Sequence, residues 1–247
     1  MGGDRMVVRP DWPAPPRVCA LSTTRRGGVS PPPYDTLNLG DHTGDDPAAV
    51  AENRARLRAA AGLPEEPRWL RQVHGTAVAA AHKVTAPVAA DAAWTDRPGV
   101  VCAVLTADCL PVLLAAGDGS AVAAAHAGWR GLAGGVLEAA VAALTARASV
   151  PPLAWLGPAI GPEAFQVGPK VREAFVAEDP EAAESFRPDA EGRYRADLFA
   201  LARRRLYSCG VTAVYGGGLC TWSSPERFFS YRRDGETGRM ATLIWLE

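Results

Sequence analysis

Three short apolar segments follow one another near the middle of the chain, at residues 100–105, 110–116 and 121–128. Glycine and aspartate turn residues bound them, and this pattern is typical of β-strands that are buried on both faces. Such strands need a covering layer on each side, so the sequence predicts stacked layers of sheet and helix. We therefore expect a layered domain with a mixed sheet.

Segments with helical and strand-like patterns surround these three runs. The clearest helix covers residues 47–61, with Asp46 as its N-cap, Pro47 as its first residue and Gly62 as its end. Other helices are predicted at 132–148, 169–179 and 196–210, and other strands at 67–75, 153–161 and 211–218, with a closing pair at 228–235 and 239–246. Their irregular alternation favours one α/β (α+β) domain over a doubly wound fold. Neither GxGxxG nor GxxxxGK[ST] occurs, so no dinucleotide site or P-loop is predicted.

The charge balance and the cysteine content exclude several classes of protein. The 26 Lys and Arg residues face 27 Asp and Glu residues, so we expect no nucleic-acid partner. No run of 18 apolar residues occurs, which predicts no membrane span. The 5 cysteines are widely spaced, and the first 16 residues lack the apolar core of a secretory signal. A reducing, cytoplasmic location is therefore expected.

Two histidines and one cysteine lie at the ends of strand-like segments. His74 and His126 each lie just before a glycine, and Cys109 lies just before Pro111, which is expected to interrupt strand pairing. Active sites are commonly found at strand ends beside tight turns. The three side chains offer two nitrogens and one sulfur, a set that zinc accepts with a fourth position open. Two alternatives remain: structural histidines with a buried cysteine, or a Cys–His nucleophile pair without metal.

Three arginine-containing segments are candidates for binding an anionic group. Arg130 lies in HAGWRG, where a glycine turn leads into a helix whose first N–H groups can bind an anion. Arg25 and Arg26 both precede a glycine pair, so that one of them could bind such a group, and Arg232 lies among aromatic residues in FFSYRRDGETGRM. Each segment has an ordinary alternative, namely a βα turn, solvated arginines or aromatic side chains that fill a core. The other histidines and cysteines are interpreted as structural, surface or core residues: His42, His82, Cys19, Cys102, Cys209 and Cys220.

A series of motifs extends from about Val18 to the C-terminus. In order they are TTRRGGVS, YDTLNLGDHTGDD, RQVHG, TADCLPVLL, AHAGWRG, GPAIGP and FFSYRRDGETGRM. Together they resemble the YfiH-like laccase-domain family, also called the multicopper polyphenol oxidase or purine nucleoside phosphorylase family. The resemblance implies a single catalytic domain at 18–247, preceded by a partly extended segment at 1–17. It also implies an α/β/β/α layered fold, which is similar to that of Cys–His deamidases.

The same resemblance implies roles for particular residues. The metal ligands that it implies, also predicted to be catalytic, are His74, Cys109 and His126. The expected metal is zinc, with copper as the alternative. The other residues predicted to act on or bind substrate are Arg25, as a catalytic residue, and Asn38, Arg130 and Arg232.

Three activities are described for members of this family. They are copper-dependent oxidation of polyphenols, zinc-dependent phosphorolysis of purine nucleosides with deamination of adenosine, and hydrolysis of wrongly added amino acids from peptidoglycan precursors. A laccase needs several copper ions and many histidines, whereas this chain has 4 histidines. We expect a zinc-dependent purine nucleoside phosphorylase that acts on adenosine, inosine and methylthioadenosine and also deaminates adenosine. The alternative is the editing amide hydrolase, followed by the copper oxidase and a non-catalytic metal-binding protein.

The partners that this reading predicts are a small-molecule nucleoside and phosphate. The chain is expected to act as a monomer or a small homo-oligomer.

Overall fold

All three central apolar segments form strands in the computed structural model, which describes residues 6–247. They are β5 (Cys102–Thr106), β6 (Leu110–Ala115) and β7 (Val122–Ala127). β6 and β7 pair with each other, whereas β5 belongs to a different sheet. The turn at residues 107–109 therefore carries the chain from one sheet to the other, and Cys109 lies in this turn.

The larger sheet has six strands in the order β12-β8-β6-β7-β4-β3. Its other strands are β3 (Val78–Ala80), β4 (Ala92–Thr95), β8 (Leu153–Leu156) and β12 (Ala213–Gly216). The two outer pairs are parallel and the central pairs are antiparallel, so the sheet is mixed as predicted.

The second sheet has four antiparallel strands in the order β1-β2-β13-β5. Its strands besides β5 are β1 (Val7–Val8), β2 (Val18–Thr23) and β13 (Met240–Leu246). Because β1 pairs with β2, part of the predicted extension at 1–17 is a sheet strand. Residues 1–5 of that extension lie outside the described residues, and the domain boundary at residue 18 stays a prediction.

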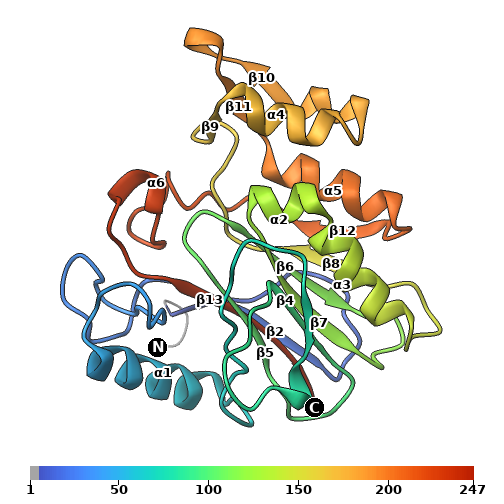
Figure 1. Cartoon of the computed structure of the whole chain (residues 1–247). Helices are drawn as coiled ribbons and strands as arrows, with labels where there is room; N and C mark the ends of the chain where they lie inside the picture. Colours follow the sequence, from blue (N-terminus) through green and yellow to red (C-terminus); the bar gives the residue numbers. More distant parts are fainter. Residues whose placement is uncertain (1–5) are drawn as a thin grey trace.

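The two sheets pack face to face and helices cover their outer faces, as Figure 1 shows. Between the sheets, Val104 and Ile244 pack with Leu113 and Trp155. Helix α1 (Pro47–Ala61) covers the four-stranded sheet through Leu57. The helices over the six-stranded sheet are α2 (Trp129–Gly134), α3 (Val136–Thr145) and α5 (Leu198–Ser208). This order of layers confirms the expected α/β/β/α fold.

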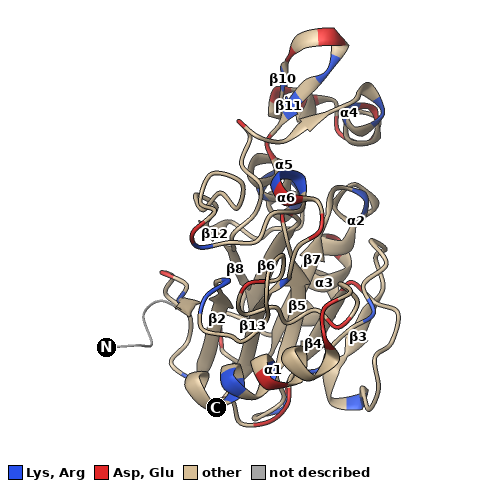
Figure 2. Ribbon diagram, turned by 90° about the vertical axis from the view of Figure 1, so that its left-hand side faces the viewer, with Lys and Arg blue, Asp and Glu red and all other residues tan. Residues whose placement is uncertain are grey.

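A small lobe projects beyond the two sheets in both views (Figures 1 and 2). It contains a three-stranded antiparallel sheet of β10 (Phe186–Pro188), β11 (Tyr194–Ala196) and β9 (Gln166–Val167), with α4 (Pro169–Val176) beside it. Short 3₁₀ helices occur at Ala81–Lys83, Pro180–Ser185 and Ala190–Gly192. Among residues 6–247, no helix has both the length and the apolar composition needed to cross a membrane.

The predicted helix at 47–61 is confirmed at both ends. The Asp46 side chain accepts a hydrogen bond from the Ala48 N–H, and Pro47 is the first helical residue. Gly62 ends the helix with φ 62°, a left-handed conformation that favours glycine.

Two predicted elements differ in the structure. The helix expected at 132–148 is divided into α2 and α3, because Gly135 between them has φ 99°. The segment 67–75 is not a regular strand, and only Arg68 and Arg71 form isolated bridges. Near its end, backbone N–H groups bond to the side chain of Asp91 instead of a neighbouring strand.

Of the predicted closing pair, the strand at 239–246 is confirmed as β13, whereas the strand at 228–235 and the pairing between the two are wrong. The segment 228–235 contains the short helix α6 (Tyr231–Asp234), because the Ser230 side chain accepts a hydrogen bond from the Arg233 N–H and caps it. Strand β13 instead lies between β2 and β5 and pairs with both.

Candidate metal centre

Two histidines and a cysteine converge at one end of the sheets. Their ligating atoms all lie within 4.8 Å of one another, and they form the one such group found among the described residues. Cys109 Sγ lies 3.8 Å from His74 Nε2, and the rings of His74 and His126 meet edge to face with centroids 4.7 Å apart. His126 belongs to β7, Cys109 to the turn between the sheets, and His74 to the loop before β3. The structure thus brings together the three side chains that the sequence analysis selected.

A buried carboxylate organises both histidines. Asp91 has no exposed surface, and its Oδ1 accepts hydrogen bonds from His126 Nδ1 at 2.8 Å and from the His74 N–H at 2.9 Å. Its Oδ2 accepts from the N–H groups of Gly75 and Val73 at 2.7 and 3.2 Å. Because Nδ1 of His126 is the donor to a carboxylate, Nε2 keeps its lone pair for a metal.

Two residues of the site have left-handed backbone conformations that are uncommon outside glycine. His74 has φ 59° and Asp108 has φ 89°. Asp108 Oδ1 accepts a hydrogen bond from Thr221 Oγ1 at 2.6 Å, and Oδ2 accepts one from the Arg232 N–H at 2.6 Å. These contacts hold the turn before Cys109 in place and join it to α6. Backbone strain that is maintained by surrounding contacts is typical of functional sites.

Gly128 leaves an open space between the three ligands. A Cβ atom at this position would lie 2.8 Å from His74 Cδ2, 3.0 Å from Cys109 Sγ and 3.4 Å from His126 Nε2. The absence of a side chain therefore creates a cradle that is bounded by all three ligands. Two imidazole nitrogens and one thiolate sulfur are a donor set that fits a single zinc ion with one position left for substrate.

The thiol of Cys109 is acidified by its neighbours. Burial alone would raise its pKa, but the charges and hydrogen bonds of His126 and His74 outweigh burial and lower the pKa to about 6. For His126, burial lowers the pKa, but the Cys109 thiolate and the Asp91 carboxylate together raise it. The pair therefore favours the thiolate, which is the form of cysteine that binds metals.

This acidity predicts how Cys109 reacts in metal-free protein. A lowered pKa means that the thiolate is already the main form at pH 7, so alkylation by iodoacetamide should reach its maximal rate near that pH. Burial and Glu138 raise the pKa of Cys209, so its alkylation should still increase above pH 8. Peptide-level mass spectrometry over a pH series measures both rates. A midpoint near pH 9 for Cys109 would show that the histidines do not acidify it.

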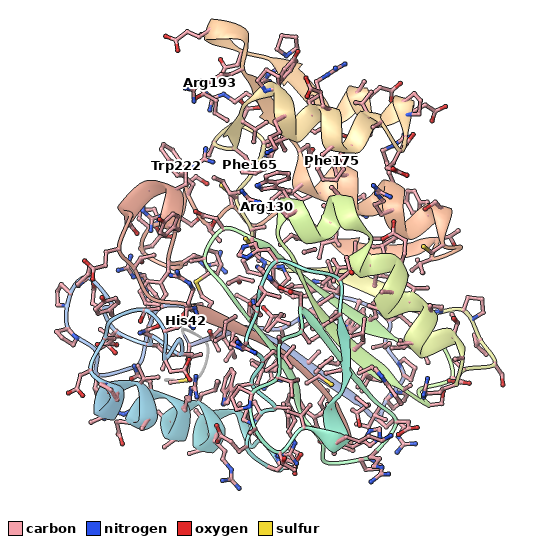
Figure 3. The ribbon with its side chains drawn as sticks, in the orientation of Figure 1. His42, Arg130, Phe165, Phe175, Arg193 and Trp222 are labelled. Atoms are coloured by element: carbon pink, nitrogen blue, oxygen red, sulfur yellow. The ribbon has the colours of Figure 1, made fainter. Side chains whose placement is uncertain are left out.

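The three ligands open into a cavity of about 560 Å³. Its wall combines apolar or aromatic surface with basic groups, and the lining residues outside the ligand set include Trp129, Phe165, Tyr231, Arg130, Arg232 and Arg239. Figure 3 shows Arg130 and Phe165 below the small lobe and His42 on the side of α1. Arg130 lies over the Trp129 ring at 4.4 Å, and Arg232 lies over the Phe165 ring at 5.4 Å. The cavity thus combines aromatic side chains with positive charge.

The structure places the other predicted site residues in two groups. Arg130 and Arg232 line the cavity, whereas Arg25 and Asn38 are not part of its lining. All three guanidinium nitrogens of Arg25 are occupied by Asp35 and the carbonyl oxygen of Pro225. Asn38 is fully buried, and its Oδ1 accepts a hydrogen bond from the Arg239 N–H at 2.9 Å. Their expected contacts with substrate stay predictions.

Three residues of the site were not singled out by the sequence analysis as functional. Asp91 carries the one charge in an alanine-rich segment at 89–93, which is an unusual position for a carboxylate and a signal in itself. Arg239 lies in the same motif as Arg232 and also lines the cavity. His42 was interpreted as structural or superficial, yet it lines the cavity with 58% of its side chain exposed.

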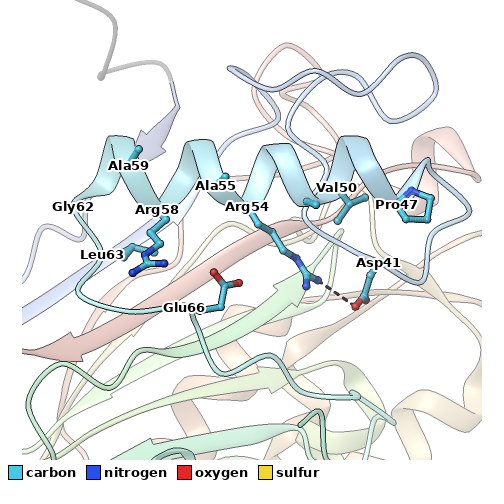
Figure 4. A pocket seen from close by; sticks show the side chains of 11 residues that line it. Asp41, Pro47, Val50, Arg54, Ala55, Arg58, Ala59, Gly62, Leu63 and Glu66 are labelled. Atoms are coloured by element: carbon cyan, nitrogen blue, oxygen red, sulfur yellow. Dashed lines mark ion pairs between the residues drawn. The ribbon is translucent and has the colours of Figure 1, made fainter. Parts of the chain in front are cut away.

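A second cavity of about 690 Å³ lies along α1. Figure 4 shows Arg54 reaching from the helix toward Asp41, with which it forms an ion pair at 3.4 Å. The guanidinium of Arg54 also lies over the Trp69 ring at 4.3 Å. Its cation is thus already paired, and the lining includes none of the metal-ligating group.

The fold agrees with the comparisons to known proteins. Residues 19–247 match the family described as multi-copper polyphenol oxidoreductase laccase. The chain therefore belongs to this family, which includes the YfiH proteins.

Particular relatives extend over nearly the whole chain. A Pseudomonas aeruginosa protein named purine nucleoside phosphorylase is 57% identical, covering 97% of this chain and 98% of its own. Escherichia coli K12 purine nucleoside phosphorylase YfiH is 55% identical with the same coverage. Among solved structures, a Neisseria meningitidis protein of the DUF152 family has a TM-score of 0.93 and 51% identity, covering 98% of this chain and 99% of its own. YlmD from Geobacillus stearothermophilus has a TM-score of 0.92 and 33% identity, covering 98% and 97%.

Proposed function

We propose that this protein is a zinc-dependent purine nucleoside phosphorylase that also deaminates adenosine. The observation that carries the proposal is the convergence of His74, Cys109 and His126 around the space at Gly128, at the base of a cavity with aromatic and basic walls. Relatives at 55–57% identity named purine nucleoside phosphorylase support it. The substrates that we propose are adenosine, inosine and methylthioadenosine, each with phosphate.

Phosphorolysis breaks the bond between C1′ of the sugar and a nitrogen of the base. A phosphate oxygen forms the new bond to C1′, and the base leaves with the electron pair and takes up a proton. Phe165 and Trp129 give the cavity an aromatic wall that suits the flat, apolar base. Arg130 and Arg232 supply positive charge for phosphate.

His74, Cys109 and His126 would hold the zinc ion. When bound, zinc supplies Lewis-acid chemistry toward a substrate oxygen or a water molecule. Asp91 orients His126 and fixes the backbone of His74, so the ligands are positioned before the metal arrives. The chain has only 4 histidines, so it can supply ligands for one ion but not for the copper cluster of a laccase.

An editing amide hydrolase is the second candidate, because one observation favours it. Cys109, His126 and Asp91 form a series in which the carboxylate bonds to His126 and His126 acidifies the thiol. A series of this kind is the arrangement of cysteine amide hydrolases.

Product analysis in the presence and absence of phosphate separates these functions. We expect inosine to give free base and ribose 1-phosphate, and cleavage to vanish in phosphate-free buffer. Adenosine deamination should persist there, because water and not phosphate is its second substrate. Both activities should disappear in His126→Ala, since they use the same ligand set.

Three outcomes would contradict the proposal. Base release that is indifferent to phosphate indicates a nucleoside hydrolase. Absence of purine turnover, with release of an amino acid from a muramyl-linked precursor, indicates the editing hydrolase. Loss of only one activity in His126→Ala would show that the two activities do not share one metal centre.

A further inference from the structure

The cavity beside the metal ligands carries more positive charge than its carboxylate can balance. Arg130, Arg232 and Arg239 all line it. The carboxylate in the lining is that of Asp108, and its two oxygens already accept hydrogen bonds from Thr221 and from the Arg232 backbone. A cavity with this balance attracts an anionic ligand.

Arg239 is held in a fixed orientation by one of its terminal nitrogens. Nη1 donates to the carbonyl oxygens of Thr237 at 2.8 Å and Gly238 at 3.0 Å. Its backbone N–H donates to Asn38 Oδ1, a side chain that is itself fully buried. Within residues 6–247, the hydrogen bonds of the Arg239 side chain all come from Nη1, so Nε and Nη2 have no hydrogen-bond partner, and no carboxylate lies within ion-pair distance. Nε and Nη2 form the side edge of the guanidinium, whose two parallel N–H groups match two phosphate oxygens.

Arg239 lies in a partly buried position, where a cation without an anionic partner is destabilised by loss of solvent. Burial lowers the pKa of its guanidinium, whereas the charges of Cys109 and Asp108 raise it. Arg239 lines the same cavity as His74, Cys109 and His126. A partly desolvated cation gains most from an anion that binds directly to it.

Other arginines nearby do not offer the same geometry. All three guanidinium nitrogens of Arg25 and of Arg233 are engaged by oxygen atoms of the protein. Arg232 Nη1 donates to the Gln166 carbonyl, and Arg232 is an exposed residue. Arg130 is exposed and lies over Trp129 without a hydrogen bond to fix its guanidinium, among the described residues. Arg239 alone among these five combines a fixed orientation, partial burial and an open edge.

We infer that Arg239 binds the phosphate co-substrate through Nε and Nη2. The inference rests on the proposed phosphorolysis and assigns the residue that determines its second substrate. Two oxygens of phosphate bond to Arg239, and a third remains free to form the bond to C1′ as the base departs. Arg130 and Arg232 then add charge from the exposed side of the cavity.

Replacing Arg239 by lysine tests this assignment, because lysine keeps the charge and loses the paired edge. We expect Arg239→Lys to raise the KM for phosphate by at least ~10-fold, with zinc content unchanged and the KM for inosine within about twofold of wild type. The matched control is Arg56→Lys on the exposed side of α1, where Arg56 pairs with Glu52. An unchanged phosphate KM in Arg239→Lys overturns the assignment.

A second measurement uses the unaltered protein, so it tests the assignment of Arg239 even if the variant does not fold. Phenylglyoxal modifies exposed guanidinium edges, and inorganic phosphate should slow the modification of Arg239 by at least ~5-fold, as followed by peptide mass spectrometry. Equal rates with and without phosphate contradict the assignment. If the wild type cleaves no nucleoside, the proposed function fails, while protection of Arg239 still reports whether phosphate binds there.

Discussion

Replacing Cys109 by alanine is expected to remove zinc from the protein and to lower nucleoside turnover by at least ~10³-fold, a loss of about 4 kcal/mol of transition-state stabilisation. The reason is that Cys109 supplies the only sulfur and the only anionic ligand in the set of three. Two neutral imidazoles alone bind zinc much more weakly than the complete set. Elemental analysis and steady-state kinetics measure the two losses.

The fold should survive this substitution. Cys109 lies in a turn and is only partly buried, and the layered core does not depend on it. We expect the free energy of unfolding of metal-free protein to change by no more than about 1 kcal/mol. Cys209→Ala is the matched control, because Cys209 is also partly buried but lies at the end of α5, and it should keep full zinc. Equal zinc content in wild type and Cys109→Ala would remove Cys109 from the site.

Elements whose signals are local were predicted well from the sequence. Helix α1 has its N-cap, first proline and terminal glycine within a few residues of its ends, so both boundaries could be read directly. The break between α2 and α3 also had a local signal, the pair Gly134-Gly135, but the alanine-rich sequence on either side outweighed it. The alanine and leucine residues after this pair have high helix propensity, whereas Gly135 itself adopts a left-handed conformation that ends the helix.

The segment 228–235 was predicted wrongly because its conformation depends on distant partners. The segment 228–235 has the composition of a strand, but β13 already has β2 on one side and β5 on the other. Ser230 and Asp108 instead bond to backbone N–H groups of α6, and Asp108 lies more than a hundred residues away in sequence. Only the folded chain reveals that partnership.

The candidate site shows the same division. His74, Cys109 and His126 were found because each lies at a strand end or a turn with glycine or proline nearby. Asp91 forms hydrogen bonds with two of them and directly precedes β4. Its only signal in the sequence is a carboxylate among alanines. Arg239 was missed because its capacity to bind an anion depends on which guanidinium nitrogens lack a protein partner, and only the three-dimensional structure shows this.

The glycine between the ligands provides a more demanding test of the metal position than removal of a ligand. Gly128 has φ −61° and ψ 153°, a conformation that alanine adopts without strain. Gly128→Ala therefore changes sterics alone, adding a methyl group 2.8 Å from His74 Cδ2 and 3.0 Å from Cys109 Sγ. Contacts this short force the ligands to move by several tenths of an ångström.

Metal sites tolerate deviations of only about 0.2 Å in ligand distance, so we expect Gly128→Ala to weaken zinc binding by at least ~100-fold. Turnover should fall in parallel, while thermal unfolding of the metal-free protein changes little. Gly168→Ala is a close control: Gly168 is also a helix N-cap with extended backbone, φ −83° and ψ 170°, but a Cβ there meets nothing within 4 Å. Competition with a chromophoric chelator measures both affinities. If Gly128→Ala binds zinc as tightly as Gly168→Ala, the ion does not occupy the space between these three ligands.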